Sequence, residues 1–259
     1  ADTPRFAIIG YGKLGGKELG YVSDLDVIFL YEDEHPDAAD GYARLARKLS
    51  AWITSATPAG ILYDLDLRLR PNGQSGLLVS TVEAFRQYQA RDAWLWEHQA
   101  LTRARFVAGD AAIGDAFEKV RFEVLSQPRD LAALRQEVLA MRARMLETHP
   151  AQPDKLKHAR GGIIDLEFIV QYLVLAYSHY HPELTGNIGN IALLHLAANA
   201  GLIEHDQAEA CQAAYRHYRR LQHAQRLNEH NSVEVDDVLR RHYADVQASI
   251  PKFTARSEL

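Results

Sequence analysis

The sequence predicts an α+β protein in which a unit with a mixed sheet is followed by an α-helical bundle. Two observations support this prediction. Short apolar runs of strand length alternate with helical stretches over roughly the first 110 residues. After that point strand signals are absent, and apolar residues recur at the spacing of one helix face. We therefore divide the chain into a first unit at 1–115 and a helical unit at 116–259.

Length and composition support two folded units. The chain has 259 residues, and its 47% hydrophobic and 24% charged residues are ordinary values for a globular protein. The formal charge of −5 argues against a nucleic-acid groove, because such grooves depend on clustered lysine and arginine. We therefore expect a protein or a small nucleotide as the target, and no nucleic acid.

Cysteine use and hydropathy predict a cytoplasmic protein. Cys211 is the only cysteine, so an intrachain disulfide is excluded and a structural zinc cluster is not indicated. No apolar run approaches the roughly 20 residues of a membrane span, and the first residues lack the features of a signal peptide, so we expect no membrane partner. Because the chain opens with Ala1 and a strand begins almost at once, we expect a fragment of a longer polypeptide.

The first two strands are expected at 6–11 and 25–31, with a glycine-rich turn between them. Successive strand side chains alternate in direction, so Asp24 and Asp26 share one face while Leu25 takes the other. Two carboxylates this close repel each other, and a bound Mg²⁺ would compensate the repulsion. The pattern by itself also fits an Asp-x-Asp at the solvated start of a strand.

A second acidic pair lies on a strand expected at 61–69. Alternation places Asp64, Asp66, Arg68 and Arg70 on one face and leucines on the other. Such a face has a carboxylate for a metal and guanidinium groups for phosphate oxygens. An amphipathic strand with one wetted side gives the same pattern, so the sequence leaves both interpretations open.

The remaining elements follow from periodicity and capping residues. We expect a strand at 76–80, a helix at 40–55 and a helix at 82–90 with Thr81 as its N-cap. In the helical unit, one apolar stripe consists of Leu131, Leu134, Val138, Met141 and Met145. Further helices are expected at 163–178, 188–200, 204–228 and 234–248, with Gly201 as a C-terminal cap.

In the helical unit, Asp165 and Glu167 lie near the expected start of the helix at 163–178. Acidic residues at a helix start favour the N-terminal dipole, and this capping role is the simpler interpretation. Two residues apart on a helix, these side chains cannot share a face, so at most one of them can reach a cleft.

Long segments of the chain resemble the glutamine synthetase adenylyltransferase family, whose members belong to the DNA polymerase β-like nucleotidyltransferase superfamily. The resemblance rests on GYGKLGGKELGYVSDLDVIFLY, GILYDLDLRLRPNGQSGLLVS, AWLWEHQALTRARFVAGD and GGIIDLEFIVQYLVL. Family members have two related halves, and this chain has one copy of each motif. The sequences of its motifs are similar to those of the C-terminal, adenylylating half.

The resemblance implies a polymerase β-like catalytic domain and a role for each matching residue. Asp24, Asp26 and Asp66 correspond to the metal-binding and catalytic carboxylates, with Asp64 the weaker candidate for the third position. The residues expected to contact the nucleotide are Gly15, Gly16, Ser23, Arg68 and Arg70. Ser23 could instead bond the local backbone, and either arginine could instead pair with an acidic residue.

The resemblance also implies an activity and partners. ATP would donate AMP to a tyrosine of glutamine synthetase and release pyrophosphate, with two Mg²⁺ ions bound in the site. Glutamine and the PII signal protein are the implied effectors. The same residues would also suit two alternatives, namely phosphorolytic removal of AMP from adenylylated glutamine synthetase and a regulatory module that binds nucleotide or PII without chemistry.

Overall fold

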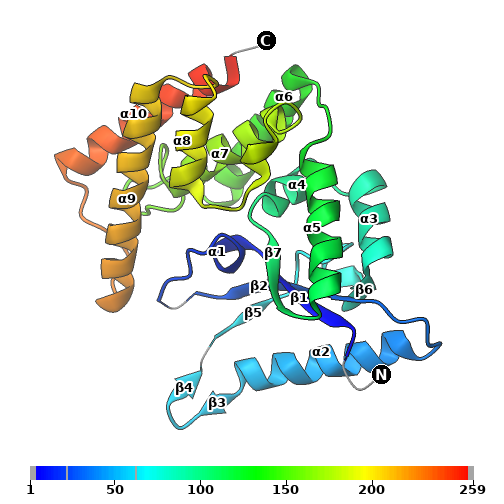
Figure 1. The fold of residues 1–259 in the computed structure, drawn as a ribbon. Helices are drawn as coiled ribbons and strands as arrows, with labels where there is room; N and C mark the ends of the chain where they lie inside the picture. Colours follow the sequence, from blue (N-terminus) through cyan, green and yellow to red (C-terminus); the bar gives the residue numbers. More distant parts are fainter. Residues whose placement is uncertain (1–3, 22, 62, 256–259) are drawn as a thin grey trace. The chain divides into compact units, whose positions relative to one another are not determined.

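A computed structural model describes residues 4–21, 23–61 and 63–255. The chain divides into two compact units, Ala1–Leu125 and Ser126–Leu259 (Figure 1). The expected division at 115/116 falls inside helix α5 (Ala111–Leu125), and the first unit instead runs to the end of that helix. The chain is α+β, as the sequence predicts, because all strands among the described residues lie in the first unit.

The sheet of the first unit is mixed. Its strands are β1 (Phe6–Gly10), β2 (Leu25–Tyr31), β5 (Leu65–Asp66), β6 (Val79–Thr81) and β7 (Arg105–Gly109). The order is β5-β2-β1-β7, and β6 also pairs with β2. Strand β1 is antiparallel to β2 and β7, whereas β5 and β6 are parallel to β2. Both short parallel strands therefore lie on the edge of β2 that faces away from β1.

The prediction of one continuous strand at 61–69 is wrong. The structure has a small hairpin of β3 (Ala56–Thr57) and β4 (Gly60–Ile61), and β5 then covers only Leu65–Asp66. Residue 62 lies outside the described residues. The chain leaves the sheet after Asp66 because the Arg70 side chain bonds backbone carbonyl oxygens on both sides of a turn. The strand expected at 76–80 is correspondingly shorter and is β6.

Helices cover both faces of the sheet. The helices of this unit are α1 (Gly12–Gly15), α2 (Ala38–Thr54), η1 (Gly73–Ser75), α3 (Val82–Arg91), α4 (Leu95–Leu101) and α5. Helix α2 packs on the face formed by Val27, Phe29 and Tyr31, and α5 lies on the opposite side of the sheet (Figure 1). Thr81 caps α3 as expected, since its hydroxyl accepts a hydrogen bond from the Ala84 N–H at 3.1 Å.

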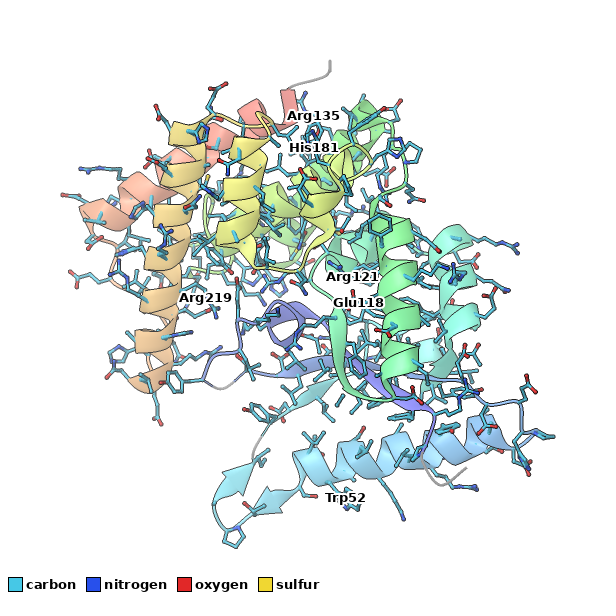
Figure 2. The ribbon with its side chains drawn as sticks, viewed as in Figure 1. Trp52, Glu118, Arg121, Arg135, His181 and Arg219 are labelled. Atoms are coloured by element: carbon cyan, nitrogen blue, oxygen red, sulfur yellow. The ribbon has the colours of Figure 1, made fainter. Side chains whose placement is uncertain are left out.

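Arg121 fixes the end of α4 against α5. Its side chain is buried and donates from Nε to the Leu101 carbonyl at 3.0 Å and from Nη2 to the Thr102 carbonyl at 2.8 Å. Figure 2 labels Arg121 on α5 together with Glu118, one turn away, whose carboxylate pairs with it. The carbonyl groups at the end of α4 are therefore satisfied by a cation, as a helix C-terminus favours.

The described part of the second unit, 126–255, contains helices and no strand. The helices are α6 (Leu131–Thr148), α7 (Ile163–Tyr177), η2 (Pro182–Thr185), α8 (Asn190–Asn199), α9 (His205–Leu227) and α10 (Asp237–Ala255). The helical prediction for this unit is thus confirmed. Gly201 has φ +70° and closes α8, because its N–H donates to the Ala198 carbonyl and the Leu202 N–H to the Ala197 carbonyl.

Helix α7 forms the core of the second unit. Its side chains are apolar around nearly the whole circumference, as the sequence IIDLEFIVQYLVLAY shows, and almost all of them are buried. Helices α6, α8, α9 and α10 each contact it. Within the part of the chain that the structure describes, no helix combines the length and the hydropathy that a membrane crossing requires.

Candidate metal centre

Three carboxylates meet at the start of the central strand. Asp24, Asp26 and Asp66 each present one oxygen atom, and these three atoms lie within 4.8 Å of one another. Asp26 and Asp66 are half-buried, and Asp24 is exposed. The structure thus brings together the three acidic residues that the sequence singles out. Asp64, the weaker candidate, is exposed and lies outside this cluster.

The register of the sheet explains the convergence. Strands β2 and β5 run parallel with Asp26 opposite Asp66, and residues at the same level of neighbouring strands point to the same face. The Leu25 N–H donates to the Asp64 carbonyl at 2.8 Å and fixes this register. Asp24 lies one residue before β2, where the strand alternation still turns its side chain toward that of Asp26.

The donor set suits a hard divalent cation. Oxygens that bind one Mg²⁺ at about 2.0–2.1 Å lie at most about 4.2 Å apart, so oxygens within 4.8 Å need only a small rotation to share an ion. The same oxygens can also bridge two ions spaced about 3.5–4 Å apart. Carboxylates are the ligands that such ions prefer, and no softer ligand belongs to the cluster.

Arg68 holds Asp66 in place. Its backbone N–H donates to Asp66 Oδ1 at 2.8 Å, its Nε lies 3.0 Å from Oδ1 and 2.9 Å from Oδ2, and its Nη2 also donates to Oδ2. These side-chain hydrogen bonds hold the pKa of Asp66 below its ordinary value, against the opposing effect of burial. The Asp66 carboxylate is therefore ionised, as a metal ligand must be.

Gly12 is a residue of the site that the sequence reasoning missed. It has φ +53°, and a Cβ added to it would lie 2.2 Å from Asp26 Oδ2. The neighbouring Tyr11 N–H donates to the Asp26 carbonyl at 2.8 Å, so the turn after β1 lies directly against the acidic strand. A glycine immediately after a buried strand is the signal in the sequence that could have indicated this close approach.

Gly15 and Gly16 have packing roles in the structure. Their N–H groups donate to the Tyr11 carbonyl at 2.8 Å and the Gly12 carbonyl at 3.0 Å, within α1. A Cβ on Gly15 would lie 1.9 Å from the Arg103 carbonyl, and one on Gly16 would lie 2.7 Å from the Arg103 guanidinium. The close approach of Arg103 therefore accounts for both glycines, independently of a phosphate.

Two other residues that were expected to contact the nucleotide form hydrogen bonds with the protein backbone. Ser23 is buried, and its hydroxyl accepts a hydrogen bond from the Gly20 N–H at 3.2 Å, which is the local alternative left open by the sequence. Arg70 donates to the carbonyls of Leu67 at 2.7 Å, Gln74 at 3.1 Å and Gly76 at 3.2 Å. Of the two arginines, Arg68 is the one at the acidic cluster.

Comparisons with known proteins find relatives over most of the chain. A family model described as glutamate-ammonia ligase adenylyltransferase matches residues 1–120, which include the whole acidic cluster. The bifunctional glutamine synthetase adenylyltransferase/adenylyl-removing enzyme of Chromobacterium violaceum is 69% identical over 243 residues, which are 94% of this chain and 27% of the relative. The chain belongs to this adenylyltransferase family.

Other members of the family also match most of the chain. The enzyme of the same description from Nitrosomonas europaea is 63% identical over 88% of this chain, and the one from Aromatoleum aromaticum is 60% identical over 88%. The chain spans about a quarter of the length of these relatives, at 25% and 24% respectively. A second family model, described as GlnD PII-uridylyltransferase, matches residues 129–244, within the helical unit.

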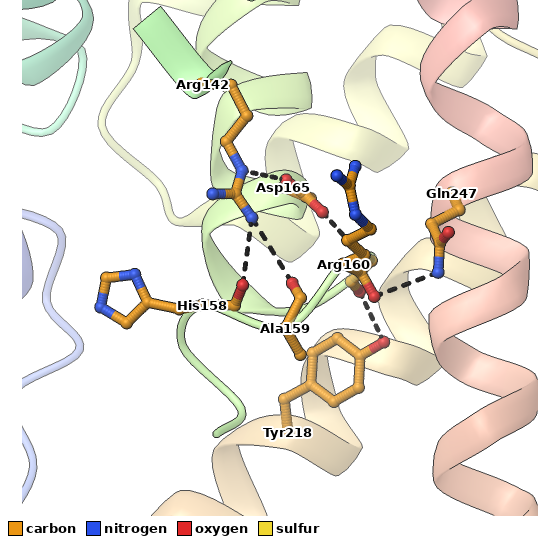
Figure 3. A network of polar contacts seen from close by, with 8 residues as sticks. Arg142, His158, Ala159, Arg160, Asp165, Tyr218 and Gln247 are labelled. Atoms are coloured by element: carbon orange, nitrogen blue, oxygen red, sulfur yellow. Dashed lines mark hydrogen bonds and ion pairs between the residues drawn. The ribbon is translucent and has the colours of Figure 1, made fainter. Parts of the chain in front are cut away.

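The acidic residue at the start of α7 has a structural partner. Figure 3 shows that Arg142 of α6 donates from Nε to Asp165 Oδ1 and from Nη2 to the carbonyls of His158 at 3.3 Å and Ala159 at 3.5 Å. The other Asp165 oxygen accepts the Gly161 N–H. Both members of this ion pair are buried, so Asp165 fixes the loop before α7.

The same loop is tied to two further helices. The Tyr218 hydroxyl of α9 donates to the Gly161 carbonyl at 2.8 Å, and Gln247 Nε2 of α10 donates to the Arg160 carbonyl at 3.1 Å (Figure 3). A Cβ on Gly161, which has φ +76°, would lie 2.1 Å from the Tyr243 carbonyl of α10. The loop at 158–161 is therefore a junction that holds the helices of the second unit together.

Proposed function

We propose that this chain is the adenylylating, C-terminal half of a glutamine synthetase adenylyltransferase and transfers AMP from ATP to a tyrosine of glutamine synthetase. The observation that carries the proposal is the convergence of Asp24, Asp26 and Asp66 from two parallel strands. A polymerase β-like nucleotidyltransferase fold, expected from the family, is consistent with a mixed sheet that presents acidic residues at one strand end. The proposal also places the protein in the cytoplasm.

The three carboxylates would hold Mg²⁺, in a pair of ions, beside the triphosphate. Bound there, the ions would polarise the α-phosphate, offset charge on the departing pyrophosphate and lower the pKa of the target phenol, which is near 10 in water. Asp24 and Asp26 supply ligands from one strand, and Asp66 from the next. Gly12 leaves room against Asp26, and Arg68 is the guanidinium nearest the cluster for phosphate oxygens.

The reaction joins the tyrosine oxygen to the α-phosphorus of ATP. It breaks the bond between the α-phosphorus and the oxygen that bridges it to the β-phosphate, and it releases pyrophosphate and the phenol proton. Asp66 is a metal ligand in this account and a candidate acceptor for that proton. The proposed partners are glutamine synthetase and ATP, with glutamine and the PII protein as effectors. The match of the helical unit to a PII-uridylyltransferase model supports an effector-linked role for that unit.

Adenylylation is tested by incubating the chain with Mg²⁺, ATP and glutamine synthetase and measuring the intact mass of the target. We expect a gain of one AMP per modified subunit. Asp26→Asn should abolish the gain, because it removes a carboxylate from the cluster, and the effect should exceed about 100-fold. Asp64→Asn is the matched control, since Asp64 is exposed, outside the cluster, and should retain activity.

Two outcomes would contradict adenylylation. No mass gain, together with release of ADP from adenylylated glutamine synthetase in the presence of phosphate, would indicate the removing activity. Metal-dependent binding of ATP with neither reaction would indicate a regulatory module.

A further inference from the structure

A positively charged side chain of the protein itself, that of Arg68, lies at the acidic cluster. The Arg68 guanidinium contacts both oxygens of Asp66, and its charge also acts on Asp24 and Asp26. The Asp66 side chain is 14% exposed, whereas that of Arg68 is 69% exposed. The guanidinium therefore lies on the solvent side of the Asp66 carboxylate.

A metal ion and this guanidinium compete for the same oxygens. A divalent ion shared by the three aspartates needs an oxygen of Asp66, and the fork of Arg68 already contacts both of them. Even where a lone pair remains free, two positive charges within one small cluster repel each other. Arg68 thus neutralises part of the repulsion among the carboxylates and at the same time opposes the ion that would replace it.

Arg68 is free to move away, and Arg70 is not. Beyond Asp66, the Arg68 side chain has no hydrogen-bond partner among the described residues. Arg70 donates to three backbone carbonyls of its own turn, so its release would disrupt that turn. A planar guanidinium displaced from a carboxylate can take up phosphate oxygens with the same two-pronged geometry.

We propose that Arg68 is an exchangeable counter-ion, which occupies Asp66 in the metal-free protein and is released by metal binding to hold the triphosphate that arrives with the metal. This inference rests on the proposed function of the cluster. It goes further, because it couples metal binding to nucleotide binding through one side chain. The metal and the nucleotide should each be bound more tightly in the presence of the other, and Arg68 should account for part of that coupling.

The first test measures Mn²⁺ binding to the full chain by isothermal titration calorimetry at low salt, without nucleotide. We expect Arg68→Gln to bind Mn²⁺ about three- to tenfold more tightly than the wild type, because the competing charge is gone, and the gain should shrink as salt screens it. Arg68→Lys keeps the charge and should stay within about twofold of the wild type.

A matched control changes an arginine at the far end of the same sheet, next to the start of β1. Arg5 contacts Glu32 at 3.5 Å, next to the end of β2, and both are exposed. Arg5→Gln removes the same charge from the chain but not from the cluster, so the Mn²⁺ affinity should not change. Thermal unfolding of each variant checks that the fold is retained.

The second test measures binding of a non-hydrolysable ATP analogue with Mg²⁺. Arg68→Gln should weaken this binding about tenfold, although it strengthens Mn²⁺ binding, and this opposite pair of effects is the signature of an exchanged counter-ion. If Arg68→Gln leaves Mn²⁺ affinity unchanged or weakens it, the inference is overturned. Asp26→Asn separates the two proposals, because undiminished Mn²⁺ binding in that variant would overturn the metal site itself.

Discussion

Gly12 shows how the absence of one side chain shapes the acidic cluster. Its φ of +53° is in the left-handed region, and the space that a Cβ would need is filled by the carboxylate of Asp26. The residue therefore meets two requirements at once, one of conformation and one of space. The requirement of space arises from Asp26 on the next strand, which is why the glycine-rich turn alone did not distinguish Gly12 from Gly15 and Gly16.

Gly12→Ala should damage both stability and metal binding. We expect a loss of about 1–2 kcal/mol in the free energy of unfolding from the strained backbone. Displacement of Asp26 should weaken Mn²⁺ binding by at least about tenfold. Urea unfolding and calorimetric titration measure the two effects.

Gly41→Ala is the control for this substitution. Gly41 lies in α2, and a Cβ there meets nothing within 4 Å. Alanine should stabilise this helix by about 0.5–1 kcal/mol and leave Mn²⁺ affinity unchanged. Equal effects of the two substitutions on metal binding would contradict the role assigned to Gly12.

At the scale of elements, the start of α7 depends on a buried ion pair. Arg142 and Asp165 are both buried, and together they bond the loop that α9 and α10 also hold. The sequence predicted α7 and an acidic residue near its start. It could not predict Arg142 as the partner, because the arginine lies on another helix within an otherwise apolar stripe.

Asp165→Ala should destabilise the second unit by about 3–5 kcal/mol, because the buried guanidinium of Arg142 would lose its counter-charge. The free energy of unfolding in urea measures this. Asp237→Ala, in an exposed pair with Arg240 at 3.9 Å, should cost less than about 1 kcal/mol. A cost of the same size at both positions would show that the Arg142–Asp165 pair does not fix the loop.

The elements that the sequence predicted correctly are recognisable from local pattern, and the strand that it missed depends on contacts with a distant part of the chain. Strand β2 and the cap at Thr81 follow from local pattern, and both were predicted at the residues where the structure has them. Strand β7 was missed, since Arg105–Gly109 is a strand through its pairing with β1. The strand at 61–69 was overextended, because alternation continues past Asp66 while Arg70 turns the chain.

At the scale of the whole molecule, the two units match two different family models. The cluster and its neighbours Gly12 and Arg68 all lie in the first unit, within the part matched by the adenylyltransferase model. The three aspartates could be predicted because strand alternation and family likeness agreed on them. For Ser23, Arg68 and Arg70 the sequence left alternatives open, because the contacts of each depend on how a turn folds back on itself.

The central claim is that these three aspartates hold divalent metal against a nucleoside triphosphate. The most direct measurement is a crystal structure with Mn²⁺ and a non-hydrolysable ATP analogue, using the anomalous signal of manganese. The account predicts anomalous density about 2–2.5 Å from oxygens of Asp24, Asp26 and Asp66, with phosphate oxygens completing the coordination. Bound analogue with no anomalous density among the three aspartates would contradict it.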